Sequence, residues 1–321
     1  MSTLASGPSP LARTEEMERE EAALAMARAA KARAYTRDGK YIRFAFPALL
    51  VIGAVIIFPW LFTIFMSLHD WQVGQTSTFV GLDNYIHLAG EDRFYLAMGR
   101  TLAYTALATF LPVFLGVAAA LVFHREFPLR NFLRGVFILP MMATPVAIAL
   151  VWTMMFHPQL GVLNYLMSLI GIPPQLWVFA ADTVIPSLVL VEVWQWTPLV
   201  MLIVLGGLSA LPTEPYESAE IDGATSWQMF RHITWPMVLP FVVVATIIRA
   251  IDAVKAFDTI FVITQGGPGT SSETINIYLY LQAFAFYKIG YSSAVVVVFF
   301  TLIVMMALVL LWVRQRVKWT G

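Results

Sequence analysis

The chain has 321 residues, of which 59% are hydrophobic and only 12% are charged. Soluble domains carry about 25% charged residues, so most of this chain is expected to lie in lipid. The net charge of +0 argues against nucleic acid as a partner. The absence of cysteine excludes disulfides, thiol chemistry and cysteine metal sites. The histidines are scattered and form no His-x-x-x-His pair.

Residues 1–43 form a polar N-terminal tail. Residues 14–35 predict a helix whose acidic residues come early and whose basic residues come late, an order that suits the helix dipole. Since this polar tail precedes the first apolar run, no cleavable signal peptide is expected. We expect a solvated cytoplasmic tail; the alternative is that its basic half lies along anionic lipid headgroups. The basic half contains Arg28, Lys31, Arg33, Arg37, Lys40 and Arg43.

Six apolar runs follow, each long enough to cross a bilayer. A transmembrane helix needs about 20 apolar residues to cross roughly 30 Å of hydrocarbon. Several runs contain proline, which a bundle tolerates when neighbouring groups satisfy the freed carbonyls. We therefore predict an all-α membrane protein with one transmembrane domain over residues 44–313 and a C-terminal tail over 314–321. The predicted spans are residues 44–66, 100–123, 135–156, 184–208, 240–264 and 291–313.

The distribution of lysine and arginine predicts the orientation of these spans. With the N-terminus inside, segments 1–43, 124–134, 209–239 and 314–321 hold fifteen basic residues, and the outside segments hold three. Cytoplasmic loops carry the excess of basic residues. Both termini are therefore predicted to be cytoplasmic, and so is the loop between the fourth and fifth spans.

The outer segments are short. Residues 157–183 contain one small amphipathic piece, residues 160–170, which predicts a short helix. Residues 265–269 are rich in glycine, but the pattern G-x-x-x-x-G-K-[ST] of a phosphate-binding loop is absent from the chain. We therefore expect no ATP binding by that route.

A polar loop over residues 212–240 separates the fourth and fifth spans. Prolines near both of its edges bias the chain away from continuous helix there. Two helix-capable pieces, 215–221 and 226–235, lie within it, and Asp222-Gly223 predicts a turn between them because glycine tolerates a positive φ. Such a compact helix–turn–helix indicates a surface to which a partner binds. The prolines are Pro212, Pro215, Pro236 and Pro240.

The stretch from Tyr216 to Pro240 resembles the cytoplasmic EAA loop of ABC-importer permeases, in their carbohydrate-importer branch. The family pattern is E-A-A, D-G-A, W-x-x-F and I-T-x-P; Ser218 replaces the second alanine, and because serine is small we expect no loss of docking. In the family this loop inserts into a cleft of the ATPase subunit and carries its motion to the membrane helices. The alternative is an ordinary amphipathic connector. The residues expected to couple to the ATPase are Glu217, Ala219, Asp222, Gly223, Ala224, Trp227, Phe230 and Pro236.

The resemblance covers residues 44–313 and implies the type I ABC importer permease fold in a bacterial inner membrane. It implies a non-catalytic subunit that forms half of the pathway for a carbohydrate, polyol or glycoside, beside a second homologous permease. Two ATPase subunits, which bind ATP and Mg²⁺, and an extracytoplasmic solute-binding protein complete the importer. This chain itself is expected to bind membrane lipid and substrate but no cofactor, no metal and no nucleic acid.

The fifth span carries four charged residues with alternating sign at every third position. Neighbouring opposite charges pair along a helix. A charge at mid-bilayer costs about 2.5–3.5 kcal/mol on insertion scales, so these side chains must face protein or water. They form either a salt ladder packed against a sister subunit or part of the translocation path. The four are Arg249, Asp252, Lys255 and Asp258.

The fourth span adds Glu192, which we expect to pair with a basic residue of the fifth span or of the partner permease; Lys255 falls at a similar depth. Sites for sugars combine aromatic rings with a few orienting polar groups, although aromatic residues also gather at membrane interfaces in any membrane protein. The residues predicted to line the substrate pathway are Glu192, Gln195, Trp196 and Trp152, together with the four charged residues of the fifth span.

The two alternative classes of function are a secondary transporter and an intramembrane enzyme. A secondary transporter could use the charged stripe as a proton relay, but internal repeats are not evident and the cytoplasmic loop would then be unexplained. An intramembrane enzyme needs a nucleophile with its base, or metal ligands, within the spans, and no such set is found.

Overall fold

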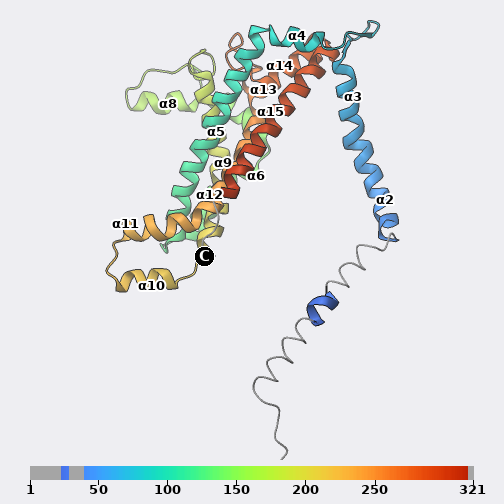
Figure 1. The fold of residues 1–321 in the computed structure, drawn as a ribbon. Coiled ribbons are helices and arrows are strands. Elements are labelled where there is room, and N and C mark those ends of the chain that lie inside the picture. The colour runs from blue at the N-terminus through green and yellow to red at the C-terminus, as the bar shows by residue number, and fades with distance from the viewer. Residues whose placement is uncertain (1–22, 29–39, 317–321) are drawn as a thin grey trace, which may run out of the picture. The chain divides into compact units, whose positions relative to one another are not determined.

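The computed structural model describes residues 23–28 and 40–316, and helices dominate them (Figure 1). The chain divides into two compact units, residues 1–62 and residues 63–321. Of the helix predicted over 14–35, residues 23–28 are helical, and the rest of that prediction lies outside the described residues. Residues 317–321 of the predicted C-terminal tail also lie outside them.

The first unit contributes most of the first span. Helix α2 (Lys40–Ile52) continues through a π-helical turn, η1 (Gly53–Ile57), into α3 (Phe58–Ser67), whose last turn belongs to the second unit. The helix Phe44–Ser67 is long and apolar enough to cross a membrane, as predicted. No side chain between Phe44 and Phe62 is buried. A helix that is apolar on all sides needs lipid or protein around it.

Four long helices form the frame of the second unit: α5 (Asp92–His124), α9 (Val184–Ser209), α12 (Trp235–Val254) and α15 (Ile289–Arg316). Helix α5 packs along α9, and both contact α12. The close approach of α5 to α9 depends on Gly116, where an added Cβ would meet the Val200 side chain at 2.6 Å. These helices bury apolar side chains between them, so the core of the unit runs along the α5–α9–α12 contact.

The predicted third span is a bent pair rather than one helix. Helix α6 (Arg130–Met142) and helix α7 (Pro145–Met155) meet at an angle of 98°. The sequence Thr144-Pro145 explains the break, because the residue before a proline is pushed to extended backbone and proline then opens the next helix; Thr144 has φ −67° and ψ 144°. The six predicted spans are therefore five continuous helices and this pair.

The boundaries predicted for the fifth span are wrong at both ends. Its helix is continuous from Ser226 to Val254, and a break at residues 255–257 separates it from α13 (Asp258–Thr264). The helix passes through Pro236 and Pro240, which had been expected to interrupt it. In the π-helical turn η2 (Phe230–Thr234), the Trp235 N–H donates to the Phe230 carbonyl, five residues earlier. This turn is wider than an α-helical turn, so the ring of Pro236 fits directly after it.

The loop between the fourth and fifth spans has the predicted helix–turn–helix form. Helix α10 (Glu214–Ile221) and helix α11 (Ser226–Met229) are its two helices, and η2 extends α11. Gly223 lies in the turn between them with φ +75°, a positive angle that glycine adopts without strain. In Figure 1 this loop lies at one end of the second unit.

The opposite end of the second unit, which we call the distal end, is built from short elements. Figure 1 shows α4 (Asp83–Ala89) and α14 (Ile275–Tyr280) there. Strands β1 (His69–Asp70) and β2 (Thr78–Phe79) pair antiparallel with His69 opposite Phe79. Helix α14 continues into the π-helical turn η3 (Leu281–Ala285). The short helix predicted over 160–170 is confirmed as α8 (Val162–Leu169).

Candidate functional site

The loop between the fourth and fifth spans is closed by local hydrogen bonds. The Ala224 N–H donates to the Ala219 carbonyl at 2.9 Å, and the Gly223 N–H donates to the Glu220 carbonyl, so the end of α10 is capped. Thr225 then starts α11 with a capping box, in which its side chain and that of Gln228 each bond to the other's backbone N–H. The turn is therefore rigid, and it fixes α11 relative to α10.

The loop presents apolar side chains to its surroundings. Ile221 is 87% exposed at the end of α10, and Trp227 is 66% exposed on α11. The Trp227 ring stacks on Phe230, with 5.5 Å between ring centroids. The loop therefore offers Ile221 and Trp227 as apolar side chains that a docking partner would bury. Of the other predicted coupling residues, Glu217, Asp222, Gly223 and Pro236 are exposed, and Ala219, Ala224 and Phe230 are half-buried.

A groove of about 910 Å³ lies between this loop and the adjoining ends of α5 and α9. Tyr216, Trp227 and Phe230 line it from the loop, and Leu121 and Leu208 line it from the two long helices. The Tyr216 hydroxyl donates to Thr234 Oγ1 at 3.0 Å, which joins the base of α10 to η2. The loop is thus connected to the fifth span by covalent continuity and by this hydrogen bond.

A buried ion pair joins the fourth and fifth spans. Arg249 Nη2 lies 2.8 Å from Glu192 Oε2, and the two side chains are 1% and 7% exposed. The predicted pairing of Glu192 with a basic residue of the fifth span is confirmed, and its partner is Arg249. Lys255 lies instead 3.4 Å from Asp252, on its own segment. Arg249 also stands over the Trp196 ring at 5.2 Å, which adds a cation–π contact.

Gln195 contacts the bend of the third span. Its amide Nε2 donates to the carbonyl of Ala143, the residue that ends α6, at 3.3 Å. Gln195 is itself buried, and its Oε1 has no hydrogen-bond partner among the described residues. Trp152 is buried on α7 and packs edge-on against Trp194 at 5.7 Å. Gln195 therefore satisfies a backbone carbonyl that the bend of the third span leaves without a helical partner.

The predicted charged stripe does not lie along one helix. Asp252 and Lys255 form an ion pair of 3.4 Å at the end of α12, and their side chains are 43% and 55% exposed. Asp258 lies beyond the break, in the first turn of α13, and has no ion pair among the described residues. Because the break places Asp258 on a separate helix, the four residues do not form one row. Only Arg249 of the four is buried, and the role of all four in the pathway stays a prediction.

A cavity of about 410 Å³ lies beside the break in the fifth span. Its walls combine the rings of Phe257, Tyr280 and Phe284 with the polar side chains of Asn276 and Ser292, and none of its lining residues is charged. Asn276 Nδ2 donates to the carbonyls of Val254 at 3.0 Å and Ala256 at 3.2 Å. It therefore caps the end of α12 and satisfies one carbonyl of the break.

Sequence reasoning missed several of these residues. The capping box of Thr225 and Gln228 has a recognisable signature, a threonine followed three residues later by glutamine. Asn276 has none, because its backbone partners lie some twenty residues earlier in the chain and meet it only in the fold. No group of three or more His, Asp or Glu residues within the described ranges is arranged to hold a metal ion.

Comparison with known proteins gives a family match and full-length relatives. The profile of the family described as "binding-protein-dependent transport system inner membrane component" matches residues 113–319. The trehalose/maltose transport system permease protein MalF of Thermococcus litoralis is 33% identical, covering 84% of this chain and 91% of the relative. The sulfoquinovosyl glycerol transport system permease protein SmoG of Agrobacterium fabrum is 30% identical, covering 80% of this chain and 84% of the relative.

The fold also has a solved counterpart. A chain of the bacterial alginate ABC transporter, solved in complex with an alginate pentasaccharide-bound periplasmic protein, superposes with a TM-score of 0.79. The identity is 20%, and the match covers 90% of this chain and 98% of that one. At this identity the likeness concerns the arrangement of helices.

Proposed function

Since the chain belongs to the family of binding-protein-dependent transport system inner membrane components, we propose that it is the permease subunit of an ABC importer for a sugar or a related polyol or glycoside. It forms half of the pathway, and a second, homologous permease forms the other half. Family membership also counts against the secondary-transporter alternative, since the loop over residues 212–240 then has a function.

The observation that carries the proposal is the capped loop with its exposed Ile221 and Trp227. Two copies of an ATPase subunit bind ATP and Mg²⁺, and one of them grips this loop; the chain itself performs no hydrolysis. The loop and both termini then lie in the cytoplasm, in agreement with the fifteen basic residues on that side. Because α11 and η2 continue directly into α12, movement of the ATPase is passed to the fifth span.

The ATPase can shift the permease between the inward- and outward-facing states only if it binds one state more tightly than the other. Different contacts between the ATPase and the loop in the two states supply this difference in affinity. An extracytoplasmic binding protein delivers the substrate at the distal end. The alginate ABC transporter was solved in complex with a periplasmic protein, which supports this partner.

The substrate class rests on the relatives and on the cavity beside the fifth-span break. The two relatives are named for trehalose/maltose and for sulfoquinovosyl glycerol, both of which contain sugar rings. The cavity offers aromatic faces and neutral polar groups, the combination that suits a hydroxylated ring. Of the predicted pathway residues, Gln195 bonds to the bend of the third span and does not line this cavity.

The proposal is tested by replacing Gly223 with proline in the complex purified with its ATPase subunits. Proline fixes φ near −65°, whereas Gly223 has φ +75°, so the turn must rearrange. We expect the spans to insert normally, while the ATPase either fails to co-purify or hydrolyses ATP without response to the binding protein. Gly171→Pro is the matched control, because Gly171 has the same φ of +75° beside α8, far along the chain from the loop.

Unchanged co-purification and unchanged stimulation in Gly223→Pro would contradict the proposal. Residues 212–240 would then be a simple connector. An equal loss in the Gly171 control would show that the effect comes from general damage rather than from the loop.

A further inference from the structure

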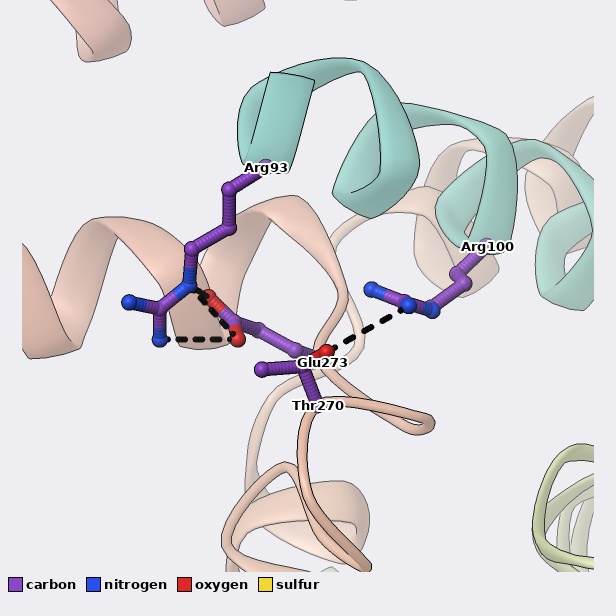
Figure 2. Close-up of polar contacts among 4 residues, drawn as sticks. All are labelled: Arg93, Arg100, Thr270 and Glu273. Atoms are coloured by element: carbon purple, nitrogen blue, oxygen red, sulfur yellow. Dashed lines mark hydrogen bonds and ion pairs between the residues drawn. The ribbon is translucent and has the colours of Figure 1, made fainter. Parts of the chain in front are cut away.

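Four consecutive residues at the distal end, Glu273 to Asn276, join α5 to the break in the fifth span. Figure 2 shows Arg93 and Arg100 reaching from α5 toward the segment that precedes α14. Helix α5 carries both arginines, and Thr270 and Glu273 lie on the opposing segment. The contacts with α5 join parts of the chain that are 170 or more residues apart in sequence.

The strongest contact is the ion pair between Arg93 and Glu273. The guanidinium donates through Nε to both carboxylate oxygens, at 3.0 and 3.1 Å, and through Nη2 to Oε2 at 2.9 Å. Glu273 is 1% exposed, so its charge has left water and depends on this partner. The two-pronged geometry fixes direction as well as distance. Arg100 adds a longer contact, 3.4 Å from its Nη2 to Thr270 Oγ1.

The next residues continue the connection inward. The Ile275 N–H donates to Thr101 Oγ1 at 2.8 Å, which joins the start of α14 to α5 a second time. Asn276 then reaches the other way and caps the carbonyls of Val254 and Ala256. The distance along the chain from the buried carboxylate to the cap is three residues. Because the connecting segment is this short, a displacement of Glu273 should also displace Asn276 and the backbone that it caps.

The rest of the loop is tied to itself rather than to α5. Ser272 Oγ lies 2.7 Å from Thr264 Oγ1 and donates to the Gly267 carbonyl at 2.6 Å. These bonds shape the glycine-rich turn at residues 265–269 into a compact unit, and the Arg93–Glu273 pair anchors that unit to α5.

We propose that Glu273 and Asn276 are positioning residues of the transport pathway. Asn276 keeps the fifth span broken after Val254, so that Phe257 stays at the wall of the cavity, and the Arg93–Glu273 pair holds Asn276 in place from the distal end. A protein that binds the distal end and shifts this pair acts on the pathway through these few residues. The inference rests on the proposed function, in which the distal end faces the binding protein.

The absence of cysteine from the chain gives a direct test. Ala256→Cys places a single reporter thiol in the break, where Ala256 is half-buried. The reporter is combined with Asn276→Asp, which keeps the shape of the side chain but exchanges its amide donor for an acceptor. The rate of thiol labelling by a small charged methanethiosulfonate reagent is measured on the assembled importer, with and without ATP and orthovanadate. We expect labelling without nucleotide to rise about tenfold, as expected for losing one to two net hydrogen bonds.

A charge swap tests the anchor. Arg93→Glu and Glu273→Arg alone should each raise labelling of Cys at position 256 as Asn276→Asp does, and the double swap should restore most of the original rate. Arg100→Gln is the control, since it removes only the single 3.4 Å contact and should change the rate by less than about twofold. A purely structural role would lower the melting temperature and leave the labelling of Cys at position 256 unchanged.

Unchanged labelling in Asn276→Asp and in both single swaps, in protein that still assembles, would overturn the inference. If one single swap fails to fold, Asn276→Asp and the double swap still decide. Failure of the proposed function looks different. In that case ATP and orthovanadate leave labelling of the otherwise unchanged reporter chain unaltered, whereas the effect of Asn276→Asp without nucleotide persists.

Discussion

Arg249 donates a hydrogen bond of 3.1 Å to the carbonyl oxygen of Ala108, in the middle of a neighbouring spanning helix. That carbonyl lacks its usual partner because residue 112, four positions on, is a proline without an N–H. The same guanidinium nitrogen bonds to Glu192. One side chain thus satisfies a broken backbone in α5 and neutralises a buried carboxylate of α9, so three spanning helices meet at Arg249.

We predict that Glu192→Gln destabilises the protein strongly. The replacement keeps the size of the side chain but leaves the Arg249 charge buried without an opposite charge. Removing one partner of a buried pair costs about 3–5 kcal/mol. The free energy of unfolding in detergent, measured by denaturant titration, is the test.

The control for this prediction is Asp252→Asn. It breaks the 3.4 Å pair with Lys255, whose side chains are 43% and 55% exposed. Exposed pairs contribute less than about 1 kcal/mol, so this variant should unfold close to the original. If the two variants had the same free energy of unfolding, burial of the Glu192–Arg249 pair would not contribute to stability.

We also predict that Pro112 and Arg249 are energetically coupled. Pro112→Ala supplies an N–H to the Ala108 carbonyl and so makes the Arg249 bond to it redundant. Arg249→Met should therefore cost about 1 kcal/mol less in the Pro112→Ala background than in the original chain. A double-mutant cycle of unfolding free energies measures this difference. Strictly additive effects would mean that Arg249 does not compensate for the proline.

The six apolar spans, the importer-permease fold and the helix–turn–helix loop could be predicted from the sequence, and the comparisons confirm the family. Long apolar runs are recognisable without knowing their neighbours, and Asp222-Gly223 marks its turn locally. The bend at Thr144-Pro145 had a local signal too, but an apolar run that includes a proline is equally compatible with a tolerated kink.

The break in the fifth span could not be predicted in the same way. Residues 255–257 contain neither glycine nor proline, and the group that caps the break is Asn276, in a segment that looked like an ordinary outer loop. The charged stripe was predicted on the assumption of one continuous helix, and the same assumption placed Lys255 at a depth similar to that of Glu192. Tertiary contacts override local pattern where a polar side chain from elsewhere satisfies the backbone.

We predict that Gly116→Ala destabilises the α5–α9 contact. The new Cβ would lie 2.6 Å from Val200 Cβ, too close for any rotamer of valine to avoid, so the helices must separate. Overpacking of this kind costs about 1–3 kcal/mol. Gly99→Ala is the matched control on the same helix, because nothing lies within 4 Å of its Cβ position. It should be neutral or stabilising by up to about 1 kcal/mol, since alanine favours helix over glycine. The prediction is tested by thermal unfolding of both variants in the same detergent. A Gly116→Ala variant as stable as the Gly99→Ala control would contradict the close packing of α5 on α9.

Ile221 is predicted to be an anchor of the ATPase on the loop. Its side chain is 87% exposed, so Ile221→Asp should leave the unfolding free energy within about 0.5 kcal/mol of the original. Burying an isoleucine contributes about 1.5–3 kcal/mol, so the loss should weaken ATPase binding by more than about tenfold. Binding of the isolated ATPase to the permease in nanodiscs gives the affinity. Leu160→Asp is the control, since Leu160 is 85% exposed beside α8 and away from the loop. If both aspartates weaken binding equally, added negative charge is the cause and Ile221 is no anchor. A loss confined to Ile221→Asp, with stability unchanged, assigns the anchor to the end of α10.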